Sequence, residues 1–501
     1  MSIGIVKGAT IVGLAEQGIA ATGTILIANN TLDAGDSVSI NGVAFVETTD
    51  FAVGVTAIIT AGNLAAAINA SINPDIFDVV TAANGGTATV TITAVKKGLG
   101  GNSITLTESD TPTNNFTLSG ATLTGGLFNE TTAALPASAT DYVQVLEDGF
   151  EISPAKELVE RNILTESIGR ITPRASTKSV SGTLPVELRA QGTEGGIPQY
   201  DLAVRGALGA RTRIKNRITT GSTHTTTTLN VTDANKKVKK WDMLVILEAG
   251  NHHVCFVTTV TGSVITFFPT APFTPSNAVQ LAKTTSYKPA NANHPVYTVN
   301  GYWGNQILEQ AIGNRSASMS LENLTTGQIV TQNYGFEGLN FEETDASASF
   351  TPSYDSGLPP LALCANVYVD GSEIQVNEIG VSLENTIGFL TSVTSCDGRI
   401  SGRVTERQVS GSLNPYKDDA SVTYFTKFDA NTTFSLVVVL ANDSVTAGEY
   451  ELGSICAFYL PNCLLTEKTV GDQEGVLTDA LSFQASRGSS GTDEEMIMGF
   501  C

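Results

Sequence analysis

The residues best suited to catalysis or metal binding are few in this chain, and their spacing favours neither chemistry. His252, His253 and Cys255 lie close together, but adjacent side chains on a strand point to opposite faces, so the two histidines do not easily share an ion. The acidic pairs Asp418-Asp419 and Glu494-Glu495 could act as glycosidase carboxylates, yet a helix start and a chain end explain them better. The sequence contains no HExxH, GxSxG or phosphate-binding glycine loop. It therefore predicts no catalytic, metal or cofactor site.

The strongest positional signal is instead a repeat of strand and turn residues 229 positions apart. Thr165 to Leu184 shares nine identities with Thr394 to Leu413, without a gap. The residues that we expect at the centre of each copy are Gly169, Gly182 and Leu184 in the first, and Gly398, Gly411 and Leu413 in the second. Such a repeat predicts two copies of one β-rich unit in a single chain. A ring that needs an even number of units could then be built from half as many chains.

Charge and cysteine usage narrow the class of protein. The chain has 501 residues, with 49 acidic against 28 basic residues and a net charge of −21. This balance argues against a protein that grips nucleic-acid phosphates. Six cysteines without a CxxC spacing indicate reduced thiols in a cytoplasmic product. Lys7 and Glu16 interrupt the only candidate signal peptide, and the longest apolar run, Phe434 to Ala441, is too short to span a membrane.

Alternating Thr, Ser, Gly and Val segments predict a mainly β (α+β) protein with two tandem β units, each with a flanking helix. Residues 1–22, 127–225 and 286–350 would form the first unit, and 360–501 the second. Residues 23–126 read as an inserted α+β module with a helix near Asn63–Asn69, and 226–285 as an inserted SH3-like β-barrel. The expected flanking helices are Pro198–Leu208 and Asp418–Phe428.

In this order the motifs resemble the major tail tube proteins of long-tailed, siphovirus-type bacteriophages, in a form with a duplicated tube domain. The match is carried by soft strand and turn patterns spread over both copies. They are Phe150–Pro154, Val180–Pro185 and Ala311–Arg315 in the first copy, and Val381–Asn385, Gly411–Leu413 and Gly471–Thr478 in the second.

The resemblance implies a structural virion protein, made in the host cytoplasm, that has no catalytic activity and no cofactor. Family members form rings that stack into a tube, and the tube conducts DNA from capsid to host without binding it specifically. Two tube domains per chain imply a homotrimeric, pseudo-sixfold ring with the module 23–126 on its outside. Tape-measure, tail-tip and terminator proteins would be its partners, and a membrane would not.

The acidic candidates for the channel wall are Glu187 and Glu322, which alternate with apolar neighbours. The sequence leaves open that both face outer solvent. Two other functions also stay open: a fibre or adhesin built from β modules, and a tail-associated hydrolase. The gap-free repeat with a helix in each copy favours the tube, and no spacing suggests a catalytic pocket.

Overall fold

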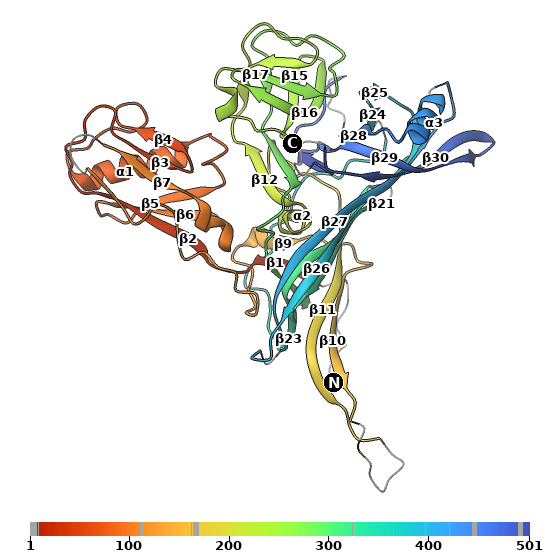
Figure 1. The fold of residues 1–501 in the computed structure, drawn as a ribbon, viewed down its shortest axis with the longest axis horizontal. Helices are drawn as coiled ribbons and strands as arrows, with labels where there is room; N and C mark the ends of the chain where they lie inside the picture. Colours follow the sequence, from red (N-terminus) through yellow and green to blue (C-terminus); the bar gives the residue numbers. More distant parts are fainter. Residues whose placement is uncertain are drawn as a thin grey trace.

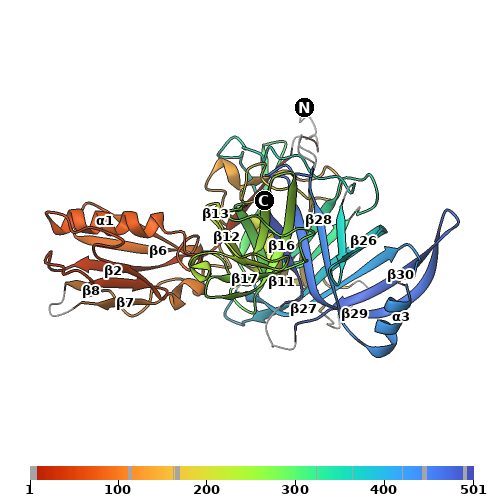
Figure 2. The same cartoon turned by 90° about the horizontal axis from the view of Figure 1, so that it is seen from above.

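The computed structural model describes residues 8, 10–110, 115–161, 163, 170–322, 324–363, 365–395, 397–419, 421–442, 448–488 and 494–501. The molecule is mainly β, as the sequence predicts, and has a central body with projecting arms (Figure 1). Seen from above, residues 23–126 extend from one side of the body, and the hairpin β29–β30 extends from the other (Figure 2).

The first half of the body is built from two sheets that share one long strand. One sheet contains β1 (Ile11–Glu16), β9 (Tyr142–Val143), β20 (Tyr297–Trp303) and β23 (Asn340–Asp345). The other contains β10 (Glu151–Val159), β11 (Arg174–Glu187) and β22 (Thr331–Gly338). β21 (Ile307–Glu322) runs through both, and a bulge between Ser316 and Ser318 marks its passage from one to the other. A bulge bends a strand in this way.

The second half repeats this pairing pattern. β29 (Cys456–Gln473) is the long shared strand, with a bulge between Leu465 and Glu467. Its partners are β28 (Phe434–Leu440), which also pairs β24 (Asn366–Val369), β31 (Ile497–Phe500), and β30 (Val476–Ala485). β30 pairs β27 (Arg399–Pro415), β27 pairs β26 (Val376–Thr391), and β24 also pairs the short β25 (Ser372–Glu373).

The two halves are joined into one sheet where β21 pairs with β26. Ser318 lies opposite Glu384, and Leu321 lies opposite Val381. One hydrophobic core therefore runs through both halves, with Leu184 and Met319 in the first and Leu383 and Leu413 in the second. We call the β21–β26 contact the internal seam.

The repeated glycines sit where a strand passes under an aromatic ring. A Cβ added at Gly182 would meet the carbonyl oxygen of Glu151 and the ring of Phe336. A Cβ added at Gly411 would meet the carbonyl oxygen of Gly380 and the ring of Phe483. Only glycine fits such a close approach of backbone and ring.

The other repeat residues have equally local reasons. Leu184 and Leu413 are each 1 % exposed in the shared core. Gly398 has φ +80, a conformation that side chains rarely adopt. Gly169 lies outside the described residues.

The flanking helices are present but bounded differently from the expectation. α2 spans Asp201–Leu208 and α3 spans Ser421–Ala430, so each begins three residues later than its predicted start. Pro198 precedes α2 in a turn, because Asp201 N–H donates to the Pro198 carbonyl. All eight residues of α2 are buried, whereas α3 buries only Ser421 and Tyr424.

Residues 23–126 form a module with its own core. A four-stranded sheet contains β5 (Val80–Asn84), β6 (Thr89–Lys97), β2 (Ala20–Ile27) and β8 (Phe116–Leu118). A three-stranded sheet contains β4 (Val43–Val46), β3 (Ser37–Ile40) and β7 (Leu106–Ser109). The predicted helix is α1, which is longer than expected at Ala57–Ala70 and buries Leu64 and Ile68 against these sheets.

Residues 218–281 form a six-stranded antiparallel sheet. Its order is β13 (Ile218–Thr219), β18 (Gln280–Leu281), β15 (Met243–Glu248), β16 (Asn251–Thr261), β17 (Val264–Phe268) and β14 (Thr228–Asn230). A hydrogen bond of 2.7 Å from Gly221 N–H to the Asn230 carbonyl links its two ends, so the sheet curls toward a barrel.

This second module is held between the two halves of the body. Its stalk strands β12 (Gly209–Ile214) and β19 (Thr284–Pro289) pair with each other, and β19 pairs with β31 of the second half. Leu244 and Ile246 lie in the module core, while Met243 and Val245 pack against the second half. The continuous apolar run in β15 is explained by burial on both faces.

Candidate functional site

One face of the sheet that runs from β10 to β29 is lined by hydroxyl, amide and carboxylate groups. Residues directly opposite each other on neighbouring strands share a face. Four rows can be followed across the strands through the registers. They are Glu151, Thr183, Gly335, Ser318, Glu384 and Gln408; Asn333, Ser320, Ser382, Ser410 and Gln484; Glu187, Thr331 and Glu322; and Gly380, Ser412, Ser482 and Glu467. Every charged residue in these rows is a glutamate.

The opposite face of the same strands is apolar and buried. Leu184, Tyr334, Met319, Leu383 and Val409 alternate with the polar rows and lie in the shared core. The alternation has the period of two that a half-buried sheet requires. The polar face is therefore a continuous wall that crosses the internal seam without interruption.

The two glutamates selected from sequence lie together on this wall. Glu187 and Glu322 both lie opposite Thr331, from its two sides. Glu187 forms an ion pair of 2.9 Å with Arg189, and Glu322 is exposed and accepts a hydrogen bond of 3.0 Å from the Ser320 hydroxyl. Glu322 thus presents the less compensated charge.

Four further glutamates on this side of the sheet escaped the sequence reasoning. Glu151, Glu384 and Glu467 belong to the rows above. Glu337 lies opposite Ser181 on one side and opposite Arg315 on the other, and the Arg315 guanidinium is buried in an ion pair with Glu130. The alternation of polar and apolar residues around Val180–Gly182 could have identified the polar face of β11. In β29, however, the bulge before Glu467 shifts the alternation of polar and apolar residues by one position. The sequence has no pattern that predicts this bulge, so alternation alone could not place Glu467 on the polar face.

Two edges of this sheet lack a partner strand among the described residues. The residue registers pair β10 only with β11. The half of β29 that follows its bulge, Glu467–Gln473, pairs only with β30. We call these the β10 edge and the β29 edge. Unpaired edges are the usual place where one chain adds to another.

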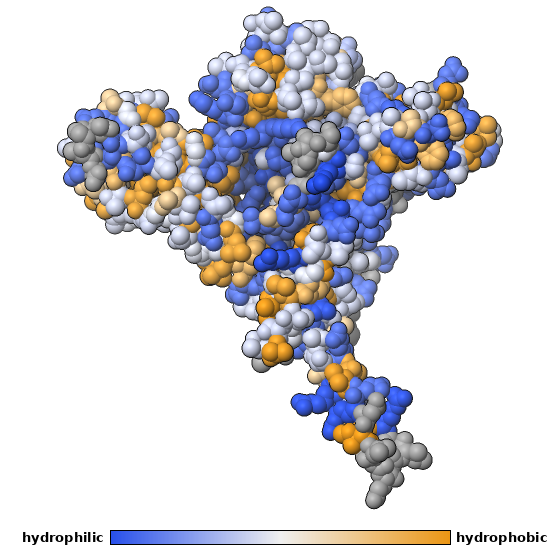
Figure 3. Space-filling view, in the orientation of Figure 1, coloured by the Kyte–Doolittle hydropathy of each residue, from blue (hydrophilic) through white to orange (hydrophobic). Residues whose placement is uncertain are grey.

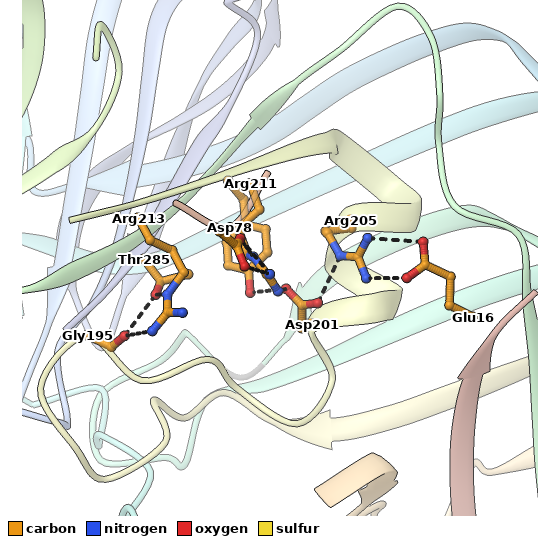
Figure 4. A network of polar contacts seen from close by, with 9 residues as sticks. Glu16, Asp78, Gly195, Asp201, Arg205, Arg211, Arg213 and Thr285 are labelled. Carbon is orange, nitrogen blue, oxygen red and sulfur yellow. Dashed lines mark hydrogen bonds and ion pairs between the residues drawn. The ribbon is translucent and has the colours of Figure 1, made fainter. Parts of the chain in front are cut away.

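A chain of buried ion pairs holds the module 23–126 against the body (Figure 4). The Arg205 guanidinium contacts Glu16 at 3.1 Å and Asp201 at 2.9 Å. The Arg211 guanidinium contacts Asp201 at 2.7 Å and Asp78 of the module at 2.6 Å. Figure 4 shows the five groups alternating in sign from Glu16 to Asp78. The alternation gives each of the three inner charges, Arg205, Asp201 and Arg211, an opposite neighbour on both sides.

The electrostatics of this junction follow from its burial. Burial alone would raise the pKa of Asp201, but the guanidinium groups of Arg211 and Arg205 hold it well below its usual range. Burial, together with the nearby positive charges of Arg205 and Arg211, lowers the pKa of Lys96 to about 8. The junction also includes cation–π contacts of Arg213 and Lys215 with Phe77, at 5.3 and 4.8 Å from the ring centre.

The residues that first suggested metal chemistry have structural roles. His252 Nδ1 accepts a hydrogen bond of 3.0 Å from Tyr450 N–H, while His253 Nε2 lies 3.1 Å from the Pro269 carbonyl oxygen. Burial lowers the pKa of both rings. Among the described residues, no three His, Cys, Asp or Glu side chains are grouped as metal ligands. The helices in the described part of the chain are all too short or too polar to cross a membrane.

The fold and the wall define a class of protein before any comparison. A β-rich body with a polar wall, two free sheet edges and modules clamped around it has the features of an assembling structural subunit. Residues 108–485 match the family model described as phage tail tube protein, and the chain belongs to that family. The matched region includes the module 218–281 and most of both halves of the body, while β1 and β31 lie outside it. A search of curated proteins found no match. The chain is therefore a structural component of the viral tail.

Proposed function

We propose that the polar wall lines a channel through which viral DNA passes. The observation that carries this proposal is the charge pattern, because all charged residues in the four rows are carboxylates. An acidic surface repels the phosphates of a duplex, whereas lysine or arginine would bind them. Serine and threonine keep the wall hydrated without adding positive charge. DNA would pass without specific binding, and the protein would catalyse no reaction.

The ring would contain three chains. Each half of the body contributes four strands to the wall, β10, β11, β22 and β21 in the first and β26, β27, β30 and β29 in the second. We infer that each half is one tube domain and that six domains close a ring of about 24 strands. With a strand spacing of about 4.8 Å and a tilt of about 40°, this ring is on the order of 50 Å across. Duplex DNA fits inside such a barrel.

The remaining segments would lie outside the wall. We propose the boundaries given by the sequence, with residues 1–22, 127–225 and 286–350 in the first tube domain and 360–501 in the second. The module 23–126 contacts the body through Asp78 and Arg211, and the module 218–281 packs on the second half through Met243 and Val245. None of these residues belongs to the polar rows, which supports an external position for both modules. Stacked rings would meet the tape-measure protein inside and the tail-tip and terminator proteins at the ends.

Electron microscopy of the purified protein, classified by rotational symmetry, tests this function. The proposal expects rings or tubes with a central hole, strict threefold symmetry and approximate sixfold symmetry. True sixfold rings would contradict the three-chain ring and leave only one tube domain of each chain at the channel. Compact monomers or rods without a hole would contradict the channel itself.

A further inference from the structure

The two flanking helices are covered very differently. All eight residues of α2 are buried, whereas Val422 and Phe425 of α3 are 69 % and 56 % exposed. Val470 on the neighbouring β29 edge is 60 % exposed. Figure 3 shows apolar residues gathered on this arm, which α3, β29 and β30 form. An exposed apolar surface of this kind indicates a missing neighbour.

In the first half of the body, the equivalent helix α2 has such a neighbour, the β26–β27 hairpin of the second half. Across the internal seam, the Asn385 amide donates a hydrogen bond of 3.1 Å to the Ala207 carbonyl at the end of α2. The Arg407 guanidinium donates one of 3.1 Å to the Leu208 carbonyl. Both donors come from the β26–β27 hairpin of the second half, which therefore holds the C-terminus of the first helix.

The β29 edge corresponds to the strand that carries the internal seam. In β21, Ser318 follows a bulge and lies opposite Gly335, next to Phe336. In β29, Glu467 follows a bulge and lies opposite Ser482, next to Phe483. Glu467–Val470 therefore corresponds to Ser318–Leu321, the four residues that pair with β26.

The β10 edge corresponds to the strand on the other side of that seam. At the repeat spacing of 229, Ile152–Ala155 of β10 corresponds to Val381–Glu384 of β26. The registers agree, since Ser153 lies opposite Ser181 and Ser382 lies opposite Ser410. At the same spacing, Lys156 and Lys178 take the places of Asn385 and Arg407.

We propose that the β29 edge and α3 of one chain dock on the β10–β11 hairpin of a second copy of this chain, in the register of the internal seam. Thr469 then lies opposite Ser153 of the second copy, and Val470 lies opposite its Ile152. In the internal seam the equivalents of this last pair, Leu321 and Val381, are 5 % and 4 % exposed. The proposal rests on the ring proposed above and specifies its contact between chains.

Charge complementarity at the end of α3 supports the same partner. α2 and α3 both stop directly before a residue with positive φ, Gly209 at 110 and Asn431 at 51, so their last turns correspond. Asp429 is exposed in that last turn of α3, where the helix dipole disfavours a negative charge. Lys178 of the second copy would lie there.

The ammonium group of Lys178 can donate further hydrogen bonds to Asp429 of the neighbouring chain. Lys178 forms an ion pair of 2.8 Å with Asp397, which uses one of the three N–H groups of its ammonium. The seam between chains differs from the internal one at Pro154, which has no amide N–H, so it loses at most one backbone hydrogen bond.

A disulfide trap tests the register in the full chain. Thr469 and Ser153 lie seven strands apart within one chain, roughly 33 Å along the sheet, so a bond between Thr469→Cys and Ser153→Cys must join two chains. Ser181 supplies the matched control, because the pair Thr469→Cys and Ser181→Cys would be two strand spacings apart, about 9.6 Å, which is beyond disulfide reach. Each single variant controls for pairing with the native thiols.

The expected result is covalent dimers and trimers from the Thr469/Ser153 variant under oxidising conditions, and none from the control pair. Rings by electron microscopy with no cross-link, or with an equal cross-link in the control, would overturn the docking register while the tube function stands. Cross-linked oligomers that form no ring would keep the contact and contradict the proposed ring. A monomer by analytical ultracentrifugation would refute both.

Discussion

Alanine at Gly182 or at Gly411 should destabilise the body, and by a similar amount at the two positions. Both residues lie in the middle of a strand. Gly182 lies opposite Ile152 and under Phe336, and Gly411 lies opposite Val381 and under Phe483. A Cβ at either position would be 3.0 Å from the ring Cε2 atom and closer still to ring Cζ and to a backbone carbonyl oxygen. Normal carbon–carbon contacts lie at about 3.5–4.0 Å.

The cost follows from which atoms must move. A flexible side chain could turn away, but here one of the blocking atoms is a carbonyl oxygen held in a sheet. Overpacking of this kind costs about 1–3 kcal/mol, and the fixed backbone places both variants near 3 kcal/mol. The glycines are four strands apart, roughly 19 Å along the sheet, so the double variant should lose about 6 kcal/mol.

Differential scanning calorimetry measures this loss as a fall in Tm. For a cooperative unit of roughly 300 residues the unfolding entropy is about 0.6 kcal/mol/K, so 3 kcal/mol lowers Tm by about 5 °C. Ser181→Ala and Ser412→Ala, at exposed neighbouring positions, should change stability by less than about 0.5 kcal/mol. If Gly411→Ala behaved like its serine control while Gly182→Ala did not, the structural equivalence of the two halves would be refuted.

Three further predictions concern the junction, the pH response and the wall. Arg211→Ala leaves two buried carboxylates without their shared partner and should cost about 3–5 kcal/mol, seen in calorimetry as a lower Tm and in limited proteolysis as earlier release of residues 23–126. Burial raises the pKa of Asp355 from 3.8 to about 6, so the folded chain binds the proton more tightly and stability falls as pH rises from about 4 to 6. Because this carboxyl is only half-buried, Asp355→Asn should stabilise the protein by about 1 kcal/mol at pH 7 and not at pH 4, and equal melting shifts at both pH values would contradict the assignment. Glu187→Lys with Glu322→Lys should leave assembly intact but slow DNA ejection, since lysines on the wall would bind phosphates; unchanged ejection kinetics would count against the channel position.

The sequence was sufficient for features that repeat or alternate. The spacing of 229 between Gly182 and Gly411 predicts two related β units, and at both positions a phenylalanine ring and a carbonyl oxygen exclude a side chain. Burial of Leu184 and Leu413 followed from alternation alone. Glu187 and Glu322 could be selected as polar positions, but only the register with Thr331 places them side by side.

The sequence could not show contacts between distant segments. Arg211 and Asp78 are 133 residues apart, and the sequence around either residue does not predict that the two form an ion pair. The pairing of β19 with β31 likewise brings Thr285 opposite Phe500. The sequence therefore could not predict that the second module is held between the two halves of the body. The start of α2 was missed because Pro198 lies in the turn that precedes the helix and is not its first residue.

The duplication also explains why the two seams of the proposed ring differ in chemistry. The internal seam forms within one chain, so no translational or rotational freedom is lost when Asn385 and Arg407 close on α2. The proposed ring of three chains has six seams. Three are internal seams, and only the other three form between chains. At those seams Lys156 and Lys178 stand in the corresponding places, and lysine is a long-range point charge where the internal seam uses planar, directional groups. Basic residues opposite the exposed Asp429 would steer the approach of the next chain, which the internal seam does not need. Raising the ionic strength should therefore slow ring assembly without loosening the internal seam.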